Sequence, residues 1–435
     1  MPDDGCTRLC VAHQQNTKGI GPITQLAVDN LESMRIVMIG PFAWAPKGTV
    51  SARAFLLGRA LVERGHQVTL IMPPYDNPPH AGWDWARDGV HLINMPLPSW
   101  GDSVRARLSV PLAMARRATG LKPDLVHVFK PLGYAGLTGL YLRLFSPRLP
   151  LVLDSDDWEG RGGWADVNPY PRLWRWVFAW QEGWLARHAD AVTVASRTLQ
   201  TQMWGLGLSP QQVFYLPNGP SPLLRECQVS PAEQRELRQA LGVGDAPLAL
   251  YIGHVSYSSE VSLIVEALPI VRAAIPEIRV VIVGAGDGIA ALHEQVQRAG
   301  LGERLLFTGW VDHQQLPAYL AAADLTLYPH RDTLVNRAKS PSKITAYMAM
   351  GKPIVASAVG EIVEYLEAGH AGLLVEPGNV RAFAKGMIAL LNDPARAAEL
   401  GRRARQRIWE HYDWTRRALT AEEAYGIAMP DGAET

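Results

Sequence analysis

The chain is poor in cysteine, has no excess of either charge and lacks a long apolar segment. Its 435 residues include three cysteines, at positions 6, 10 and 227, which excludes a disulfide framework and favours a reducing cytoplasm. Cys6 and Cys10 have no second ligand pair, which argues against a zinc site there. No apolar run reaches the roughly 18 residues that span a bilayer. The 42 basic and 42 acidic side chains cancel, and no Lys/Arg-rich run of the kind that binds nucleic acid is present.

What is present is the composition of a globular protein with a substantial core. Hydrophobic residues make up 48% of the chain and charged residues 19%, which excludes disorder, and the length predicts two or three domains. Residues 34–220 hold 19 Lys and Arg against 13 Asp and Glu. This mildly basic N-terminal half indicates an anionic partner such as lipid head groups, but not nucleic acid.

Residues 1–33 differ from the rest. They show neither helical nor strand periodicity and lack the apolar core and cleavage site of a signal peptide. We expect a disordered extension here, with the fold beginning at Met34.

After Met34, short β-branched runs alternate with helical patterns. The expected strands lie at 35–40, 67–72, 90–95, 124–129, 150–154, 190–195 and 212–216 and, after a polar, Pro-rich stretch at 217–247, at 248–252, 278–283, 304–308, 325–328, 353–357 and 372–375. A helix is expected at 51–64, with Ser51 as its cap and Gly65 as its stop. Buried apolar strands separated by helices indicate parallel sheets covered on both faces.

The alternation predicts an α/β protein of two doubly wound, Rossmann-like domains that face a cleft. The expected N-terminal domain spans residues 34–220 and the C-terminal domain 221–408, followed by amphipathic helix at 409–429. Because ligands bind at the carboxyl ends of parallel strands, the cleft is the expected site.

A dehydrogenase is one class of protein with such domains. Its G-x-G-x-x-G fingerprint is missing after the first strand, where residues 40–49 read GPFAWAPKGT. In the C-terminal half, residues 284–288 read GAGDG, which puts the third glycine in the wrong place. The sequence therefore argues against dinucleotide redox chemistry.

The C-terminal half carries a more specific pattern. It contains Ser340-Pro341-Ser342-Lys343-Ile344-Thr345-Ala346-Tyr347, continuing to Ser357, and in order around it Val283-Gly284-Ala285-Gly286, Phe307-Thr308-Gly309-Trp310-Val311, Ala323-Asp324-Leu325-Thr326-Leu327-Tyr328-Pro329 and Gly372-Leu373-Leu374-Val375-Glu376-Pro377-Gly378. Over residues 34–425 the chain resembles the group 1 glycosyltransferases, the family 4 enzymes of the GT-B fold. The resemblance implies sugar transfer from a nucleotide-sugar with retained anomeric configuration, without metal or cofactor. Asp413-Trp414 then begins a helix that crosses back onto the N-terminal domain.

The resemblance also implies which residues hold the donor. The strand end at 307–311 meets the nucleobase through its backbone, and the 340–347 block meets the diphosphate and ribose, where glycine turns and helix N-termini offer free N–H groups. Lys47-Gly48-Thr49 takes the place of the family's glycine-rich loop. The expected donor-binding residues are Gly48, Gly253, His254, Gly284, Gly286, Trp310, Val311, Arg337, Lys339, Lys343 and Tyr347.

The sequence departs from the family's pattern at the charged residues that usually serve the donor site. The family's two glutamates fall at Ala338 and Ala346, and its Arg and Lys fall at His254 and at Ser259 or Glu260. Its His-x-His pair is reduced to a single histidine, His127, which we retain as a catalytic candidate. Two explanations are open. Either other cations, among Arg331, Arg337, Lys339 and Lys343, replace the missing ones at a rebuilt donor site, or the transfer activity has been lost. The four cations also fit an ordinary solvated loop.

Clustered carboxylates follow the strand at 150–154, in the run Asp154-Ser155-Asp156-Asp157-Trp158-Glu159. At the cleft edge, Asp156 and Asp157 are expected to bind sugar hydroxyls and to take the proton of the acceptor. Asp-Ser-Asp also mimics a metal motif of an unrelated glycosyltransferase fold, but we expect no metal. The alternative is an Asx-type turn that caps the next helix.

Trp176, Trp180 and Trp184 form one stripe of a helix near 170–187. This stripe fits either of two roles: packing on the sheet, or contact with an anionic membrane aided by Arg172, Arg175 and Arg187. The arginine-rich segment 104–119 is a second candidate surface for anionic lipid.

The predicted function is that of a glycosyltransferase acting on a glycan, lipid or small-molecule acceptor, typical of cell-envelope polysaccharide synthesis in the cytoplasm or at the inner face of the membrane. A degenerate relative that binds sugar-nucleotide or glycan for another transferase is the alternative. A GT-B epimerase or phosphorylase lacks motif support.

Overall fold

The computed structural model describes residues 33–45, 48–99, 103–256 and 259–429, so Lys47 and all but the last residue of the extension expected at 1–33 lie outside the described residues. The strands are β1 (Arg35–Ile39), β2 (Gln67–Met72), β3 (Asp84–Arg87), β4 (Val90–Asn94), β5 (Leu125–Phe129), β6 (Leu151–Ser155), β7 (Ala191–Val194), β8 (Val213–Tyr215), β9 (Leu248–Ile252), β10 (Arg279–Val283), β11 (Leu305–Gly309), β12 (Leu325–Tyr328), β13 (Ile354–Ser357) and β14 (Leu373–Val375).

The α-helices are α2 (Phe55–Glu63), α3 (Val104–Gly120), α4 (Gly133–Phe145), α5 (Trp164–Val167), α6 (Arg172–His188), α7 (Arg197–Gly205), α8 (Pro231–Ala240), α9 (Ser262–Ala274), α10 (Ile289–Arg298), α11 (Leu316–Ala322), α12 (Leu334–Ala338), α13 (Ser342–Ala349), α14 (Glu361–Tyr365), α15 (Val380–Leu391), α16 (Pro394–His411) and α17 (Trp414–Ala428). Short 3-10 turns lie at Pro78–His80, Pro210–Gln212, Pro222–Leu224 and Glu367–Gly369. Within the described part of the chain, no helix combines the length and apolarity needed to cross a bilayer.

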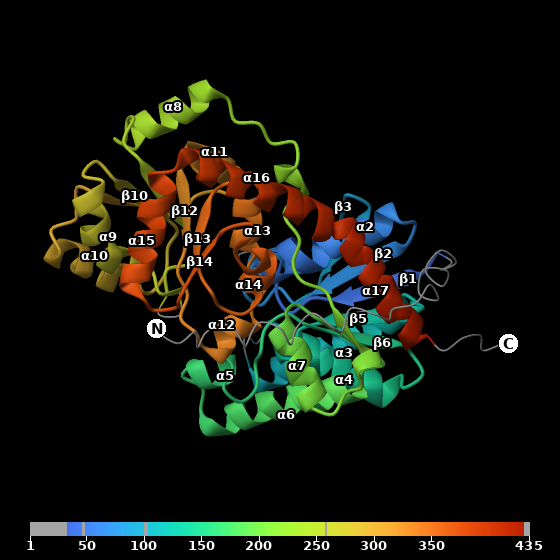
Figure 1. The fold of residues 1–435 in the computed structure, drawn as a ribbon. Coiled ribbons are helices and arrows are strands. Elements are labelled where there is room, and N and C mark those ends of the chain that lie inside the picture. The colour runs from blue at the N-terminus through green and yellow to red at the C-terminus, as the bar shows by residue number, and fades with distance from the viewer. Residues whose placement is uncertain (1–32, 46–47, 100–102, 257–258, 430–435) are drawn as a thin grey trace, which may run out of the picture.

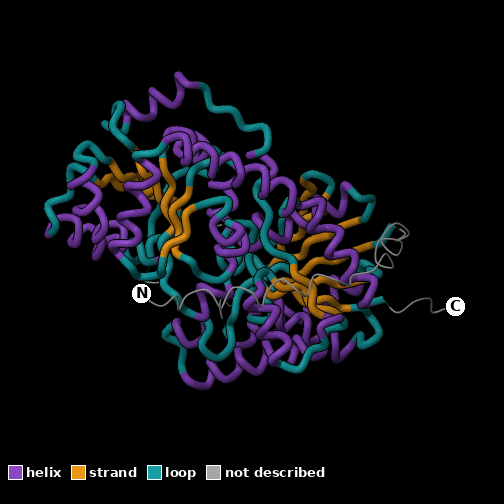
Figure 2. The backbone as a smooth tube through the Cα atoms, viewed as in Figure 1, coloured by secondary structure: helices purple, strands orange, loops and turns teal. Residues whose placement is uncertain are grey.

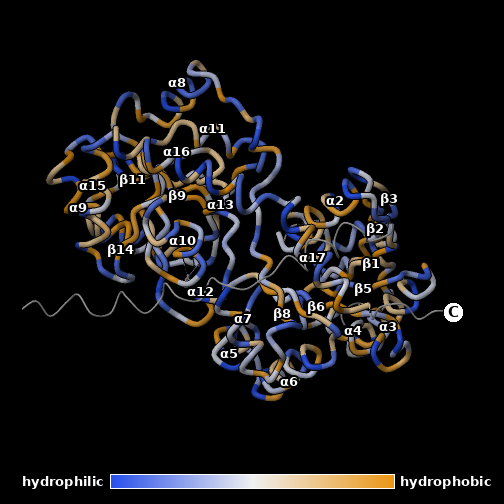
Figure 3. The backbone as a smooth tube through the Cα atoms, turned by 45° about the vertical axis from the view of Figure 1, so that its right-hand side comes forward, coloured by the Kyte–Doolittle hydropathy of each residue, from blue (hydrophilic) through white to orange (hydrophobic). Residues whose placement is uncertain are grey.

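The strands form two separate sheets, which Figure 2 shows as two groups of orange segments surrounded by helices. The first has the order β3-β4-β2-β1-β5-β6-β7-β8 and the second β11-β10-β9-β12-β13-β14. All named pairs are parallel except β3–β4 at an exposed edge. In strands such as β1, β5 and β9 every residue except Arg35 and His127 is apolar, because helices cover both faces of the sheets. Figure 3 shows the contrast with α8, a hydrophilic helix that has no buried residue.

The helix expected at 51–64 forms, but its first turn differs from the prediction. Val50–Ala54 is π-helical, the cap position is Thr49, and no side chain caps it. Ser51 therefore lies inside the helix rather than at its start. Gly65, with φ +97°, ends the helix as expected.

The two halves are joined twice. The chain passes from β8 to the second half through residues 216–220, and it returns after α16 (Figure 1). Helix α17 then packs on α2 and on β6, β7 and β8 of the first sheet. Its Trp414 and Tyr425 belong to the same apolar cluster as Leu57 and Leu216. The last helix thus completes the core of the first half.

Candidate active site

A cavity of about 360 Å³ opens where strand ends of both sheets meet. The first half lines it with Gly48, Thr49, Ala52, Arg53, Asp156, Asp157, Trp164 and Asn218, and the second with Tyr251, Ile252, Gly253, His254, Ser256, Ser259, Tyr328, His330, Lys339, Ser340, Pro341, Ser342 and Lys343. Much of this wall directly follows the carboxyl ends of β6, β9 and β12, as a doubly wound architecture predicts.

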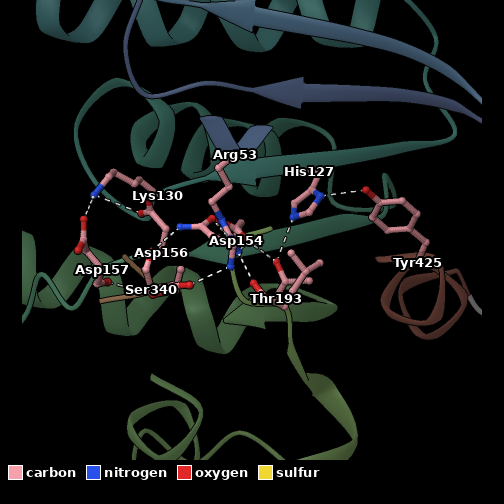
Figure 4. Close-up of polar contacts among 12 residues, drawn as sticks. Arg53, His127, Lys130, Asp154, Asp156, Asp157, Thr193, Ser340 and Tyr425 are labelled. Carbon is pink, nitrogen blue, oxygen red and sulfur yellow. Dashed lines mark hydrogen bonds and ion pairs between the residues drawn. The ribbon is translucent and has the colours of Figure 1, made fainter. Parts of the chain in front are cut away.

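The floor of the cavity on the first half is a buried ion pair (Figure 4). Arg53 lies in the π-helical turn, and its Nε and Nη2 donate to Oδ1 and Oδ2 of Asp154 at 2.7 and 2.6 Å. Its Nη1 also donates to Oδ1 of Asn218 at 2.8 Å, and the Thr193 hydroxyl donates to Asp154 at 2.6 Å. Each charge is therefore matched by several bonds, which is the condition under which a buried pair is tolerated.

Beside this pair, Lys130 gathers three carboxylates. Its Nζ lies 3.2 Å from Asp156, 2.8 Å from Asp157 and 3.0 Å from Glu159. Burial alone would lower the pKa of Lys130, but the three carboxylates outweigh burial and hold it well above its ordinary value. One lysine cannot neutralise three acids, so this edge of the cavity carries negative charge.

The two aspartates of this cluster have opposite pKa shifts. Burial raises the pKa of Asp156 to about 6, against the attraction of Lys130. Burial acts the same way on Asp157, but Lys130, which donates to its Oδ2, outweighs it and lowers the pKa of Asp157. Asp156 can therefore exchange a proton near neutral pH while Asp157 stays ionised. The helix that follows has Gly163 at its cap position, so neither aspartate acts as the capping residue considered above.

The opposite wall presents two lysines and a helix start. Helix α13 begins at Ser342 beside the cavity, and its first-turn N–H groups have no partners within the helix. The Lys343 side chain is exposed on this concave wall, where surrounding protein lowers its pKa. Lys339 donates to Asn336 at 3.0 Å and lies 4.7 Å from the centre of the Trp164 ring. This wall suits an anion.

His330 contributes a neutral imidazole to the same wall. Its Nδ1 donates to the carbonyl of Pro329 at 2.5 Å, and its ring stacks on Tyr328. Burial, the largest cause, and the nearby Lys339 lower its pKa to about 3. Since Nδ1 carries the proton, Nε2 is left as a hydrogen-bond acceptor.

Seven of the predicted site residues line the cavity: Gly48, Asp156, Asp157, Gly253, His254, Lys339 and Lys343. His254, expected to substitute for an arginine, is largely exposed and lies 3.5 Å from Asp287 at its Nε2. Ser259 is engaged locally, its hydroxyl donating to the carbonyl of Ser256 at 2.8 Å.

His127 does not line the cavity, which corrects its assignment as a catalytic residue. It is fully buried in β5, with Nδ1 2.9 Å from the Tyr425 hydroxyl and Nε2 3.2 Å from the Thr193 hydroxyl. Burial, the largest cause, lowers its pKa to about 4. A neutral histidine enclosed by three elements serves the packing of α17 and the position of Asp154 through Thr193.

Arg337 and Tyr347 also lie elsewhere than predicted. Arg337 is exposed and pairs with Asp332 through two bonds. Tyr347 is fully buried, and its hydroxyl accepts from the Ile252 amide at 2.7 Å. Arg337 therefore forms an ordinary surface ion pair, whereas Tyr347 fixes the end of β9 just before the cavity wall through its hydrogen bond to Ile252.

The remaining predicted residues, Gly284, Gly286, Trp310 and Val311, do not line the active-site cavity themselves. A Cβ at Gly284, with φ +143°, would lie 1.9 Å from the Gly253 carbonyl oxygen, and one at Gly286 would lie 2.1 Å from that of Val255. The two glycines thus allow the β9 and β10 loops to touch. Val311 is partly buried against the core, and Trp310 is 70% exposed next to Gly309, which ends β11.

Sequence reasoning missed Arg53, Lys130, Asn218 and His330. Arg53 and Lys130 pair with acids 101 and 27 positions away, and neither stands in a recognisable motif. One signal was available, because Lys130 directly follows a strand and thus had to lie at the same sheet edge as Asp156. The described residues contain no group of three or more His, Cys, Asp and Glu that could hold a metal.

Comparison with known proteins gives family matches in both halves. Residues 48–219 match the model of the glycosyl transferase 4-like domain, and residues 233–407 that of glycosyl transferases group 1. The chain is 26% identical over 416 residues to a glycogen synthase of Mycobacterium tuberculosis, covering 90% of this chain and 94% of the relative. It is 27% identical over 242 residues to a GDP-mannose-dependent alpha-(1-6)-phosphatidylinositol monomannoside mannosyltransferase of Mycolicibacterium smegmatis, covering 55% and 63%.

Two solved structures show the same architecture. HepE of Anabaena, in complex with UDP and glucose, superposes with a TM-score of 0.70 at 20% identity, covering 90% of this chain and 99% of that one. Sucrose-phosphate synthase of Thermosynechococcus elongatus gives 0.70 at 24% identity, covering 90% and 98%. The predicted fold is confirmed.

Proposed function

The chain belongs to the group 1 glycosyltransferases of family 4, and from that membership we propose that it transfers a sugar from a nucleotide-sugar bound against α13 to an acceptor hydroxyl beside Asp156. The observation that carries the proposal is the polarity of the cavity. One wall holds Lys339, Lys343 and a helix N-terminus, and the other holds the acids around Lys130.

The cationic wall fits a nucleoside diphosphate, which brings about two negative charges that are costly to leave unpaired in a partly desolvated cleft. A helix N-terminus supplies only about half a charge. Lys339 and Lys343 supply the rest as point charges, taking over from the arginine and lysine that this chain lacks. This arrangement supports the rebuilt donor site over the loss of transfer.

In the proposed reaction, the bond between the anomeric carbon and the diphosphate oxygen breaks as a bond from that carbon to the acceptor oxygen forms. The acceptor hydroxyl loses a proton, which Asp156 accepts, and the nucleoside diphosphate leaves as the anion held by Lys339 and Lys343. Membership in family 4 supports retention of configuration at the anomeric carbon, without a metal or cofactor.

An exposed apolar surface beside the acceptor side supports a lipid-linked acceptor. Trp164 lines the cavity and begins α5, and α6 follows with Leu173 and Trp176 exposed by 68% and 63%. Trp180 continues this stripe, so the helix does not bury all three tryptophans of the motif on the sheet. We call the exposed residues Val167, Tyr170, Leu173, Trp174, Trp176 and Trp180 the α5–α6 patch.

Arg172 and Arg187 lie on α6, the helix that carries most of this patch, and Arg107 of α3 lies over the Trp174 ring at 5.9 Å. Tryptophan and arginine at one surface favour the interface of an anionic bilayer. Co-sedimentation with phosphatidylglycerol vesicles tests this. Trp176→Ser should reduce binding severalfold, whereas Trp204→Ser, which removes an exposed tryptophan of α7, should not. Equal binding by both variants would exclude the patch.

The function itself is tested by a thermal-shift screen of UDP-, GDP- and dTDP-sugars, followed by assay of donor hydrolysis and transfer. Asp156→Asn should abolish most transfer while leaving donor binding and the melting temperature nearly unchanged. A wild-type protein that binds no nucleotide-sugar at millimolar concentration would contradict transfer. Binding without turnover would favour a degenerate partner of another transferase.

A further inference from the structure

A second cavity, of about 350 Å³, lies where the two halves join, on a different surface from the active site. It is lined by Arg197, Tyr215, Glu364, Arg407, His411, Tyr412, Arg417 and Thr420. We call it the joint cavity. Helices α7 and α17 and strand β8 contribute from the first half, and α14 and α16 from the second. Any molecule bound here contacts both halves.

The unusual feature of the joint cavity is Arg417. Its side chain is only 9% exposed, and its Nε is buried without a hydrogen-bond partner. Its Nη2 donates to the His411 carbonyl at 2.6 Å, and within the described residues no carboxylate lies within ion-pair distance of it. Buried charges in proteins are normally paired, because an unpaired one costs several kcal/mol of desolvation.

The neighbouring charges do not satisfy Arg417. Arg407 pairs with Glu367 at 3.3 Å, and the Arg197 guanidinium lies 3.7 Å from the centre of the Tyr215 ring. The buried carboxylate of Glu361 accepts from the Tyr215 hydroxyl and the Arg197 amide. Glu364 lies on the exposed rim. Three arginines and two tyrosines therefore face a space in which one arginine lacks an anion.

We propose that the joint cavity binds the phosphate group of a small molecule, with Arg417 as its buried anchor and Arg197 and Arg407 beside it. Arginine presents a planar fork of donors that matches a phosphate. The volume lies within the range of small-molecule sites.

The joint cavity and the active site share a wall. Tyr412 lines the joint cavity, and its ring lies 4.7 Å from that of Tyr365. The Tyr365 hydroxyl is 2.7 Å both from the hydroxyl of Ser340 and from the carbonyl of Asn218, which line the active site. Tyr412 and Tyr365 therefore connect the joint cavity to residues that line the active site.

Calorimetric titration with inorganic phosphate, against chloride at equal ionic strength, tests the proposal. Because phosphate also suits the active site, wild type should show two classes of binding, of which Lys343→Ala removes one. Arg417→Gln should weaken the other at least tenfold. Arg416→Gln, the same change at the exposed neighbouring position, should leave both intact.

If Arg417→Gln folds poorly, Arg197→Gln replaces an exposed member of the cavity and should weaken the same class severalfold. Unchanged phosphate binding in a folded Arg417→Gln variant would overturn the proposal. So would a wild type whose only phosphate binding disappears with Lys343→Ala, which would leave the active site as the single anion site and the proposed function intact.

Discussion

Arg337 lies in α12 and Lys343 lies six positions later in α13, yet of the two only Lys343 lines the cavity. We predict that Lys343→Ala weakens nucleotide binding by about 1.5–3 kcal/mol, the range for hydrogen bonds to charged groups. Arg337 is exposed and paired with Asp332, so Arg337→Ala should change nucleotide affinity less than about threefold, or about 0.65 kcal/mol. Calorimetric titration of both variants decides. A larger effect at Arg337 would place the diphosphate outside the cavity described.

Glu182 of α6 is expected to make the stability of the fold depend on pH, and a single substitution can separate its contribution from the others. It is fully buried, and Oε2 has no partner among the described residues. Burial is the largest cause that raises its pKa to about 8. As pH rises, the unfolded chain ionises near 4.5 while the folded chain holds the proton until about 8, so stability falls across this window, by up to roughly 5 kcal/mol.

Glu182→Gln should remove this part of the slope, because an amide does not titrate. Urea unfolding of wild type and variant at pH 5, 7 and 9 measures it. The variant should gain stability relative to wild type as pH rises. Parallel pH profiles would show that Glu182 is ionised, or solvated, in the folded protein.

Single residues were the least predictable part of the site. Asp156, Asp157 and Lys343 could be placed at the cavity because each follows a strand or begins a helix with a recognisable pattern. His127 lies in the middle of β5, and the sequence does not tell which side of this strand faces α17. Arg53 looked like an ordinary helix residue, and its partner Asp154 became visible only once the sheet was formed.

Among the elements, α17 adds one buried carboxylate, that of Glu422, to its apolar packing on the first half. Glu422 accepts from Nη2 of Arg64 at 2.8 Å and from Nε2 of His66 at 3.0 Å. Burial alone would raise the pKa of Glu422, but His66 and Arg64 outweigh it and lower the pKa. Glu422→Gln should cost about 2–4 kcal/mol of stability at pH 7, since the amide removes the negative charge and one of the two oxygens that accept from Arg64 and His66.

The matched control is Glu423→Gln, the next residue, which has no ion pair within the described part of the chain and should change stability by less than about 0.5 kcal/mol. Because the folded pKa of Glu422 is lowered, its contribution is present above the unfolded pKa and disappears as pH falls through the folded one. Chemical denaturation at pH 7 and pH 4 tests this. An equal loss at both values would assign the effect to packing instead.

Elements were far more predictable than side chains. The expected strands all form, because short, largely apolar runs between helical patterns nearly always become buried strands in an α/β chain. The strand β3 was missed, since Asp84–Arg87 is short and exposed and pairs only at an edge. The helix α6 was predicted, but packing on the sheet and exposure both remained open for its tryptophans, because periodicity does not show which stripe faces the core.

For the whole molecule, one of the contacts that join the halves is a small hydrogen-bonded group at the crossing. The Asn218 amide donates to the Ser340 hydroxyl at 2.8 Å, and the Tyr365 hydroxyl bonds to both residues. Tyr365→Phe should cost about 1–2 kcal/mol of stability. It should raise the KM for the donor severalfold with kcat nearly unchanged, because Asn218 and Ser340 line the active site.

Tyr412→Phe is the control, since its hydroxyl makes only a long bond of 3.4 Å to the Glu364 carbonyl. It keeps the ring packed on Tyr365 and should leave KM unchanged. Steady-state kinetics and thermal unfolding of both variants provide the measurements. If Tyr365→Phe also leaves KM unchanged, this hydrogen-bonded group does not set the geometry of the donor site.

The return of α17 to the first half has a consequence for synthesis on the ribosome. The last strand of the first sheet ends at Tyr215, whereas the helix that closes its core begins at Trp414, about 200 residues later. At about 5–20 residues per second, the nascent first half waits on the order of 10–40 s with the groove over β6, β7 and β8 uncovered. During that interval it offers an apolar surface to chaperones and to other nascent chains. A stop codon just before Trp414 would therefore leave the core of the first half incomplete, although that half is synthesised first.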